Sequence, residues 1–149
     1  MTDLALIWND AAANADLGLL GADLATDDGL RTAIIISLFS DRLARADDDL
    51  PDNTADRRGW WGDSFPQFDG DLIGSRLWLL DRAKEVPATL TSAQDYAVEA
   101  LAWLIEDGLA TTVSAEAVWT APGALGLTVT VTRPDGEVAG FYFLWEASA

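Results

Sequence analysis

Carboxylates are the side chains of this sequence best suited to chemistry, because the commoner catalytic groups are missing. The 149 residues include no histidine and no cysteine, which removes the usual general base, the usual metal ligand and the thiolate nucleophile. Asp69 and Asp71 flank Gly70 and form the best pair for acid–base work. Glycoside hydrolysis needs two carboxylates at a defined separation, and the sequence does not predict one. We interpret both as solvated loop acids.

A run of three aspartates, Asp47–Asp49, carries enough charge to attract a hard cation. It lacks the Asp-x-Asp-x-Asp-Gly spacing of a calcium loop, so we interpret it as the solvated end of a helix. The glycine motifs of nucleotide sites and of serine hydrolases do not occur. We therefore expect no metal and no cofactor.

The segment DRRGWWGD, residues 56–63, favours binding over catalysis. Arg57 and Arg58 are two of only nine cations in the chain. Arginine pairs with carboxylates through two hydrogen bonds and stacks on tryptophan, so such a cluster suits an internal loop latch or a protein interface. Adjacent side chains of an extended segment point to opposite sides. We predict that one of Trp60 and Trp61 holds the loop on its own core, and that the other is presented outward or to a nearby groove.

Two residues of the next predicted helix, Arg76 and Trp78, are close enough in sequence to complete this cluster. Tryptophan and arginine are also the residue types that dominate interface energetics. We therefore assign Arg76 and Trp78, with the loop residues, to a predicted partner-binding surface.

The overall charge narrows the class of partner. With 25 acidic and nine basic residues the formal net charge is −16, which repels phosphate backbones and anionic membranes. The sequence contains no apolar run of membrane-spanning length and no basic region of a signal peptide at its start. We expect a cytoplasmically made protein with one domain over residues 1–149 that binds neither nucleic acid nor a membrane.

The elements that must position these residues follow from hydrophobic periodicity. Alternation over Asp3–Trp8 predicts a short strand, and Ala15–Ala25 predicts either a second strand or a turn. A helix is expected from about Thr26 to Asp49, with Asp27 or Asp28 as its N-cap. Its three consecutive isoleucines would also suit a strand, but the length and the capping favour a helix.

A long connection over residues 47–71 follows, and its length indicates a functional loop. A short helix is then expected from Gly74 to Pro87, with Ser75 as its cap. A longer helix over Thr91–Gly108 is predicted by the capping-box pair Thr91 and Gln94 and by its terminal glycine.

After Gly108 the period changes to two, which predicts strands. Residues 111–120, 127–132 and 138–145 alternate, and Pro134–Gly136 supplies a hairpin turn. The predicted fold class is α+β. About three helices pack on a C-terminal three-stranded antiparallel sheet, preceded by a short N-terminal strand or hairpin.

The last predicted strand is apolar on both faces, because Tyr142 and Leu144 alternate with other large apolar residues. Such a strand is covered either by helices or by another chain. A terminal strand can also lie at a sheet edge, where its free backbone groups can pair with a strand of a partner. We therefore add Tyr142 and Leu144 to the predicted partner-binding residues. The alternative is that helices of the same domain cover both faces and that neighbouring strands pair both edges.

Four segments resemble the phage Mu gene-46 family of contractile-tail baseplate proteins. They are DGLRTAIIISLFSDRLARADDDLP, DRRGWWGD, IGSRLWLLDRAK and YAVEALAWLIEDG, and the resemblance runs from about Asp3 to Trp145. That family is in turn similar to the wedge proteins, or sheath initiators, of T-even phages and related contractile injection systems. The resemblance implies a virion structural protein, assembled in the host cytoplasm and present in several copies in the tail baseplate. The implied partners are other wedge subunits and the tail sheath protein, with the tail tube or hub as a further contact.

Two other functions remain open. Relatives in this wider group carry a lysozyme label, so a peptidoglycan hydrolase using the carboxylates of Asp69 and Asp71 is one alternative. A regulatory protein-binding module of the same fold is the other. An assembly protein without catalysis is favoured, because the sequence shows no evident pair of acid and nucleophile.

Overall fold

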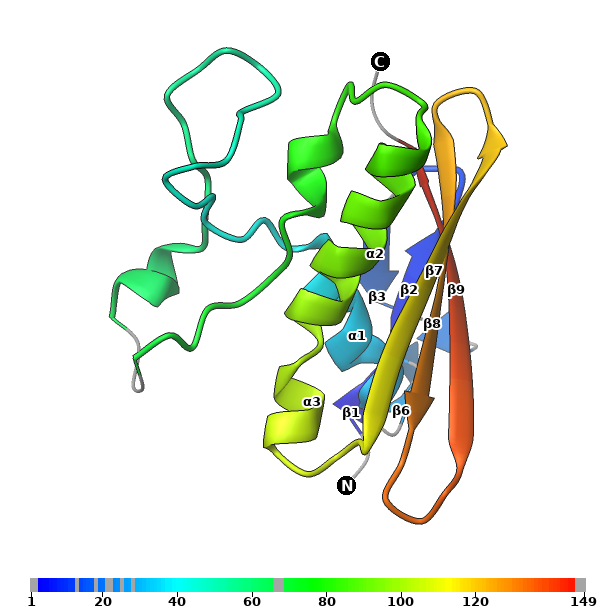
Figure 1. Ribbon diagram of the computed structural model, residues 1–149. Helices are drawn as coiled ribbons and strands as arrows, with labels where there is room; N and C mark the ends of the chain where they lie inside the picture. Colours follow the sequence, from blue (N-terminus) through cyan, green and yellow to red (C-terminus); the bar gives the residue numbers. More distant parts are fainter. Residues whose placement is uncertain are drawn as a thin grey trace.

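The computed structural model describes residues 3–12, 14–17, 19–20, 23–24, 26–27, 29–65 and 69–146. Within these ranges the fold is α+β, as predicted, with helices packed on a three-stranded antiparallel sheet (Figure 1). Its elements are β1 (Asp3–Leu4), β2 (Leu6–Asn9), β3 (Asn14–Leu17), β4 (Leu19–Leu20), β5 (Asp23–Leu24), β6 (Thr26–Asp27), α1 (Leu30–Phe39), α2 (Pro87–Ala100), α3 (Trp103–Glu106), β7 (Thr112–Ala121), β8 (Ala124–Thr132) and β9 (Val138–Glu146), with 3-10 turns at Trp61–Ser64 and Leu77–Leu80.

The C-terminal sheet forms as its alternating pattern predicts. Its strand order is β7-β8-β9, so β8 is central and β9 lies at an edge. The odd-numbered positions of β8, from Leu125 to Val131, are fully buried together with Phe143 of β9. The even-numbered face is partly open, since Val118 and Tyr142 are exposed there. Helices therefore cover one face of the sheet, and the alternative that they cover both is wrong for the described residues.

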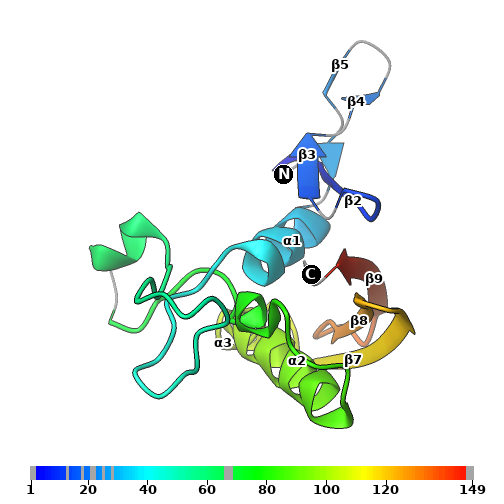
Figure 2. The same cartoon turned by 90° about the horizontal axis from the view of Figure 1, so that it is seen from above.

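The helices lie on the buried face, as the two cartoon views show. Seen from above, α1 lies between the β2–β3 pair and α2, and the sheet curves beside the helices (Figure 2). Three aromatic rings join these layers. Trp8 of β2 stacks on Phe39 of α1 at 3.8 Å between centroids, and Phe39 meets Phe143 edge-on at 5.4 Å. The first, middle and last parts of the chain thus share one core.

The N-terminal segment is a hairpin, the second of the two forms predicted. Strand β2 pairs with β3, and the shorter strands pair as β1 with β6 and β4 with β5, all antiparallel. Because Thr26 and Asp27 pair with Leu4 and Asp3, this segment is a strand and not the first turn of a helix. The predicted N-cap at Asp27 is therefore wrong, and Gly29, at φ 84°, precedes α1 instead. Asp28 lies outside the described residues.

Helix α1 also ends earlier than predicted. At Ser40 the backbone becomes extended, and the chain pairs with a segment 35 residues later. Ser75 N–H donates to the Ser40 carbonyl at 2.9 Å, and Arg42 N–H donates to the Ser75 carbonyl at 2.9 Å. A side chain on Gly74 would lie only 2.4 Å from the Ser40 oxygen. This backbone pairing, which we call the Ser40–Ser75 clamp, closes the base of the long loop.

The predicted helix at Gly74–Pro87 is reduced to a 3-10 turn at Leu77–Leu80. Ser75 still serves its first turn, because its hydroxyl accepts the Leu77 N–H at 3.2 Å. The same hydroxyl donates to the Leu38 carbonyl of α1. The clamp thus engages both the backbone and the side chain of Ser75.

The predicted helix at Thr91–Gly108 differs at its start and in its middle. It begins four residues earlier, at Pro87, whose fixed φ suits a first helical position. The Thr91 hydroxyl donates to the Pro87 carbonyl, so the predicted capping box is wrong. The chain leaves the helix at Leu101 and resumes as α3, which ends before Gly108 at φ 73°, as predicted. No helix in the described ranges has the length and apolarity needed to cross a bilayer.

Adjacent residues of β9 provide a test of this layering. Phe143 is fully buried, whereas half of the Tyr142 surface is exposed on the opposite face. We expect Phe143→Ala to lower the free energy of unfolding by about 3–5 kcal/mol, since it leaves a cavity beside Trp8 and Phe39. Tyr142→Ala is the matched control and should cost about 1 kcal/mol or less. Urea unfolding followed by tryptophan fluorescence would measure both. Equal losses would contradict the assignment of the two faces.

Candidate functional site

The long loop between α1 and α2, residues 40–76, brings together most of the predicted partner-binding residues. It extends away from the helices and the sheet on the left of Figure 1. Arg57, Arg58 and Arg76 contact other parts of this chain, whereas Trp60 and Trp61 are exposed, which separates the predicted residues into two groups.

Arg58 is the first internal residue of the loop. Its guanidinium lies 4.4 Å from the ring centroid of Trp78 and bridges Asp41 at 3.0 Å and Asp81 at 3.7 Å. Trp78 is buried, and its indole N–H donates to the Arg42 carbonyl at 2.8 Å. Burial raises the pKa of Asp81, against the opposing charge of Arg58. The predicted arginine–tryptophan stack is therefore present and latches the loop to the turn at Leu77–Leu80.

Arg76 forms the second internal contact, which we call the Arg76 latch. It bridges Asp48 at 2.7 Å and Glu99 at 2.9 Å, and its guanidinium lies 4.5 Å from the ring centroid of Tyr96. Burial acts to lower the pKa of Arg76, but its hydrogen bonds and charge pairs with Glu99 and Asp48 outweigh this and raise it. Burial also raises the pKa of the Tyr96 hydroxyl. The latch ties the loop, through Asp48, to helix α2.

Arg57 is also engaged within the chain. Its guanidinium donates to the carbonyls of Arg45 and Ala46, so it closes the loop on itself. Arg76 and Trp78 are thus buried within this chain, and Arg57, of intermediate burial, is engaged in contacts within it. The partner-binding role assigned to them stays a prediction, and in this geometry they would act by holding the loop.

The aromatic residues of the loop are exposed. Trp60 keeps 47% of its surface accessible, Trp61 76% and Phe65 82%. The chain turns into a 3-10 turn at Trp61, so the two indoles do not point to opposite sides as an extended segment would require. Their rings lie 5.4 Å apart. Trp60 lies over Gly62 and against a groove, whereas Trp61 faces outward.

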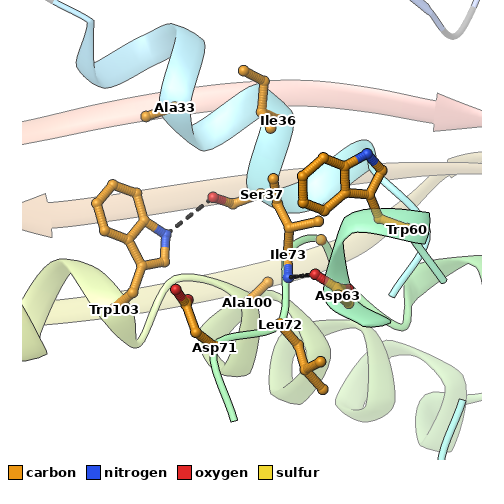
Figure 3. Close-up of a pocket in the computed structure, with 11 residues that line it drawn as sticks. Ala33, Ile36, Ser37, Trp60, Asp63, Asp71, Leu72, Ile73, Ala100 and Trp103 are labelled. Atoms are coloured by element: carbon orange, nitrogen blue, oxygen red, sulfur yellow. Dashed lines mark hydrogen bonds between the residues drawn. The ribbon is translucent and has the colours of Figure 1, made fainter. Parts of the chain in front are cut away.

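The groove beside Trp60, which we call the Trp60 groove, has a volume of about 340 Å³. Figure 3 shows Ile36 of α1, Ile73 of the loop and Trp103 of α3 around it. The Trp103 indole N–H donates to the Ser37 hydroxyl at 3.0 Å, and the Ile73 N–H donates to a carboxylate oxygen of Asp63 at 3.3 Å. These bonds fix opposite walls of the groove.

Carboxylates gather next to this groove. Asp71 belongs to its wall and also to a second hollow, which Asp69, Glu99, Glu106 and Asp107 line together with Arg42. Asp69 and Asp71 are both exposed. Among the described residues, no three acids converge in a geometry that could hold a metal ion.

The free edge of β9 is the other candidate surface. The N–H of Leu144 donates to Asp10 and its carbonyl accepts from the Trp8 indole, both at 3.0 Å. These groups therefore point away from β8. Because backbone groups alternate in direction along a strand, the N–H groups of Gly140 and Tyr142 point the same way, and no described strand pairs there. The N-terminal hairpin thus covers the edge at Leu144 and leaves it open toward Val138.

Sequence reasoning missed part of this site. Neither Ile36 nor Trp103 was selected as a site residue, yet both line the Trp60 groove and Ile36 is 38% exposed. Phe65 was not selected at all. The run of three isoleucines in α1 was the available signal, since consecutive residues of a helix cannot all face one core.

The Arg76 latch yields a prediction about the loop. Arg76→Met leaves Asp48 and Glu99 without their shared cation, so we expect a loss of about 3 kcal/mol in the free energy of unfolding. Faster proteolysis within residues 47–56 should accompany it. Arg82→Met removes the same charge from an exposed position and serves as control. Thermal unfolding and limited proteolysis would measure both, and equal behaviour of the two variants would contradict the latch.

Comparison with known proteins adds sequence evidence to this geometry. The family described as Phage protein GP46 matches residues 30–138. The Baseplate protein gp46 of Escherichia phage Mu is 47% identical over 143 residues, which cover 96% of this chain and 95% of the relative. The Mu-like prophage FluMu protein gp46 of Haemophilus influenzae is 43% identical over 137 residues, covering 92% and 91%. The resemblance predicted from the loop and helix segments is confirmed, and the chain belongs to the Phage protein GP46 family.

Proposed function

We propose that this chain is a structural component of a contractile phage or prophage tail baseplate. The observation that carries the proposal is the 47% identity, over nearly the full length of both chains, to a protein named as a baseplate protein in phage Mu. The exposed aromatics on an internally latched loop agree with it, since rigid aromatics are typical anchors of protein interfaces. Assembly in the host cytoplasm and several copies for each baseplate are part of the same proposal.

Contacts to other wedge subunits are proposed for the loop. Its internal arginines hold the backbone, while Trp60, Trp61 and Phe65 keep most or about half of their surface accessible. A preorganised loop loses little conformational entropy when it binds. The tail tube or hub would be a further contact of the same assembly.

Contact to the sheath protein is proposed for the β9 edge. Strand addition uses free backbone groups for affinity and alternate side chains for register. The open part of the edge, toward Val138, offers the N–H groups of Gly140 and Tyr142, and Tyr142 adds an exposed ring that lies across Gly126. Initiation of the sheath would then begin as pairing of a sheath strand with β9.

We propose no catalytic step. Asp69 and Asp71 are exposed and share their hollow with three further acids and Arg42, an arrangement that suits solvated charges better than an acid and a nucleophile. Nothing observed in the described part of the chain favours the hydrolase or the regulatory module over assembly.

A deletion and complementation experiment tests the baseplate function. In a tail gene cluster that lacks the gene for this chain, the wild-type chain should restore infective tails that contain it. Trp60→Ala combined with Trp61→Ala should leave a folded protein, since Trp61 is largely exposed and Trp60 about half exposed, but should lower the yield of complete tails at least about tenfold. Circular dichroism melts, electron microscopy and plaque counts would measure this.

Trp78→Ala is the matched control for that experiment, because it removes a buried indole of the same cluster. It should unfold or strongly destabilise the chain by about 3–5 kcal/mol. An unfolded Trp60/Trp61 variant would show that these rings are core. Failure of the wild-type chain to enter any tail would refute the baseplate function itself.

The β9 edge predicts a separate defect. Tyr142→Pro removes an N–H that points away from β8, so the chain should remain folded with a modest loss of stability. We expect baseplates to form in its presence and sheaths to fail to polymerise. Phe141→Pro is the control. The N–H of Phe141 points toward β8 and takes part in the hydrogen-bond ladder between the two strands, so its removal should unfold the sheet. Normal sheathed tails with Tyr142→Pro would rule out strand addition at this edge.

A further inference from the structure

The Trp60 groove is open, apolar and preformed. Ile36 and Trp60 line it with more than a third of their surfaces still accessible, and Trp103 forms its far wall (Figure 3). Its volume of about 340 Å³ lies within the range of small binding pockets. No described side chain of this chain fills it.

The walls of the groove are held in place without a partner. The Trp103 indole N–H is hydrogen-bonded to the Ser37 hydroxyl of α1, and the Asp63 carboxylate accepts a hydrogen bond from the backbone N–H of Ile73. The Ser40–Ser75 clamp and the Arg76 latch fix the two ends of the loop that carries Trp60. A side chain entering the groove would therefore find its contacts already arranged, which lowers the entropic cost of binding.

One residue of the groove wall carries an acceptor without a donor. The second carboxylate oxygen of Asp63 is buried and makes no hydrogen bond within the described structure. A buried charged oxygen without a donor is costly, and a charged donor would satisfy it best. Asp63 thus contributes negative charge to the wall of the groove, and a cationic group on the occupant would complement that charge.

The negative charge around the groove also favours an occupant that carries a cationic group. Asp71 lies in its wall, and Glu106 and Asp107 line the adjoining hollow. The cation of that hollow, Arg42, already pairs with Glu99 at 3.7 Å and donates to the Leu72 carbonyl at 3.1 Å. The rim is therefore negative, and complementary charge on a partner would add both affinity and orientation.

We infer that the Trp60 groove is the docking site for a segment of another baseplate subunit that inserts one large apolar side chain flanked by Lys or Arg. The apolar side chain would pack between Ile36, Trp60 and Trp103, and the cation would reach Asp63 or Asp71. This inference rests on the proposed baseplate function. A second copy of this chain suits the groove poorly, since each copy carries a formal net charge of −16.

A photo-crosslinking experiment on assembled tails tests the inference. Ile36→benzoylphenylalanine places the probe on the groove, and Ile105→benzoylphenylalanine, at an exposed isoleucine of α3 outside the groove lining, is the matched control. After irradiation, mass spectrometry identifies the crosslinked peptide. We expect the probe at Ile36 to capture one peptide of a different tail subunit, with Lys or Arg within a few residues of the captured apolar residue. The control probe should not capture that peptide.

The charge requirement is tested in the same particles. Asp63→Asn keeps an oxygen for the Ile73 N–H, and combined with Asp71→Asn it removes both charges that the cation could reach. The crosslink yield for each incorporated chain should then fall by roughly tenfold or more. Asp95→Asn, at an exposed site on α2, should leave the yield unchanged.

The outcomes separate the two proposals. Three outcomes in tails that contain the chain would overturn the groove inference and leave the baseplate function standing. The probe at Ile36 captures nothing, it captures a second copy of this chain, or it captures a peptide without a basic residue. An unchanged yield with Asp63→Asn combined with Asp71→Asn overturns the cationic part. If the chain enters no tail at all, the baseplate function fails, and the inference that rests on it fails too.

Discussion

The buried guanidinium of Arg76 joins parts of the molecule that the backbone alone would leave independent. It pairs with Asp48 of the loop and with Glu99 of α2, and it stacks on Tyr96. A buried ion pair of this kind contributes little net stability compared with a well-packed apolar contact, but losing one partner is costly. The ion pairs of Arg76 matter here because they fix the position of the loop. It fixes one arm of a long loop against a helix, and the neighbouring clamp at Ser75 fixes the other arm against the end of α1.

With both arms fixed, the loop can present large aromatic side chains to solvent without collapsing onto the core. Ion pairs of arginine with aspartate and glutamate carry several internal contacts of the loop, while the large aromatic side chains Trp60, Trp61 and Phe65 are exposed. The sheet also has one buried and one open face. Helices bury one face, while the other face, with Tyr142 and Val118, stays accessible to solvent. Both features place apolar surface where another subunit could cover it.

The sequence predicts the sheet well because its alternation is strict and its turn residues are explicit. Local sequence patterns predicted the α+β class and the hairpin around Pro134–Gly136, and they indicated a cluster of arginine and tryptophan. The boundaries of the helices were predicted less well. Helix α1 is shorter than its apolar pattern because Ser40 pairs with Ser75 and Thr26 pairs with Leu4, and such pairings between distant segments leave no local signal.

The candidate site was predictable in composition but not in geometry. The residue types of the loop indicated a cluster, yet only the fold shows that Arg76 and Trp78 are internal while Phe65 is exposed. The Trp60 groove lay beyond sequence reasoning altogether, since its walls come from α1, the loop and α3. Residues separated by up to 70 positions meet there only once the long loop has closed.

The contacts of Leu144 with the N-terminal hairpin affect how the chain reaches its native state during synthesis. The indole of Trp8 donates to a carbonyl 136 residues later, so β2 cannot complete this bond until β9 has left the ribosome. Pairings of such high sequence separation slow folding and leave strand edges unprotected in the meantime. The nascent hairpin, with Ile7 and Leu17 exposed even in the finished fold, is therefore open to chaperones and to premature association until β9 has paired with β8.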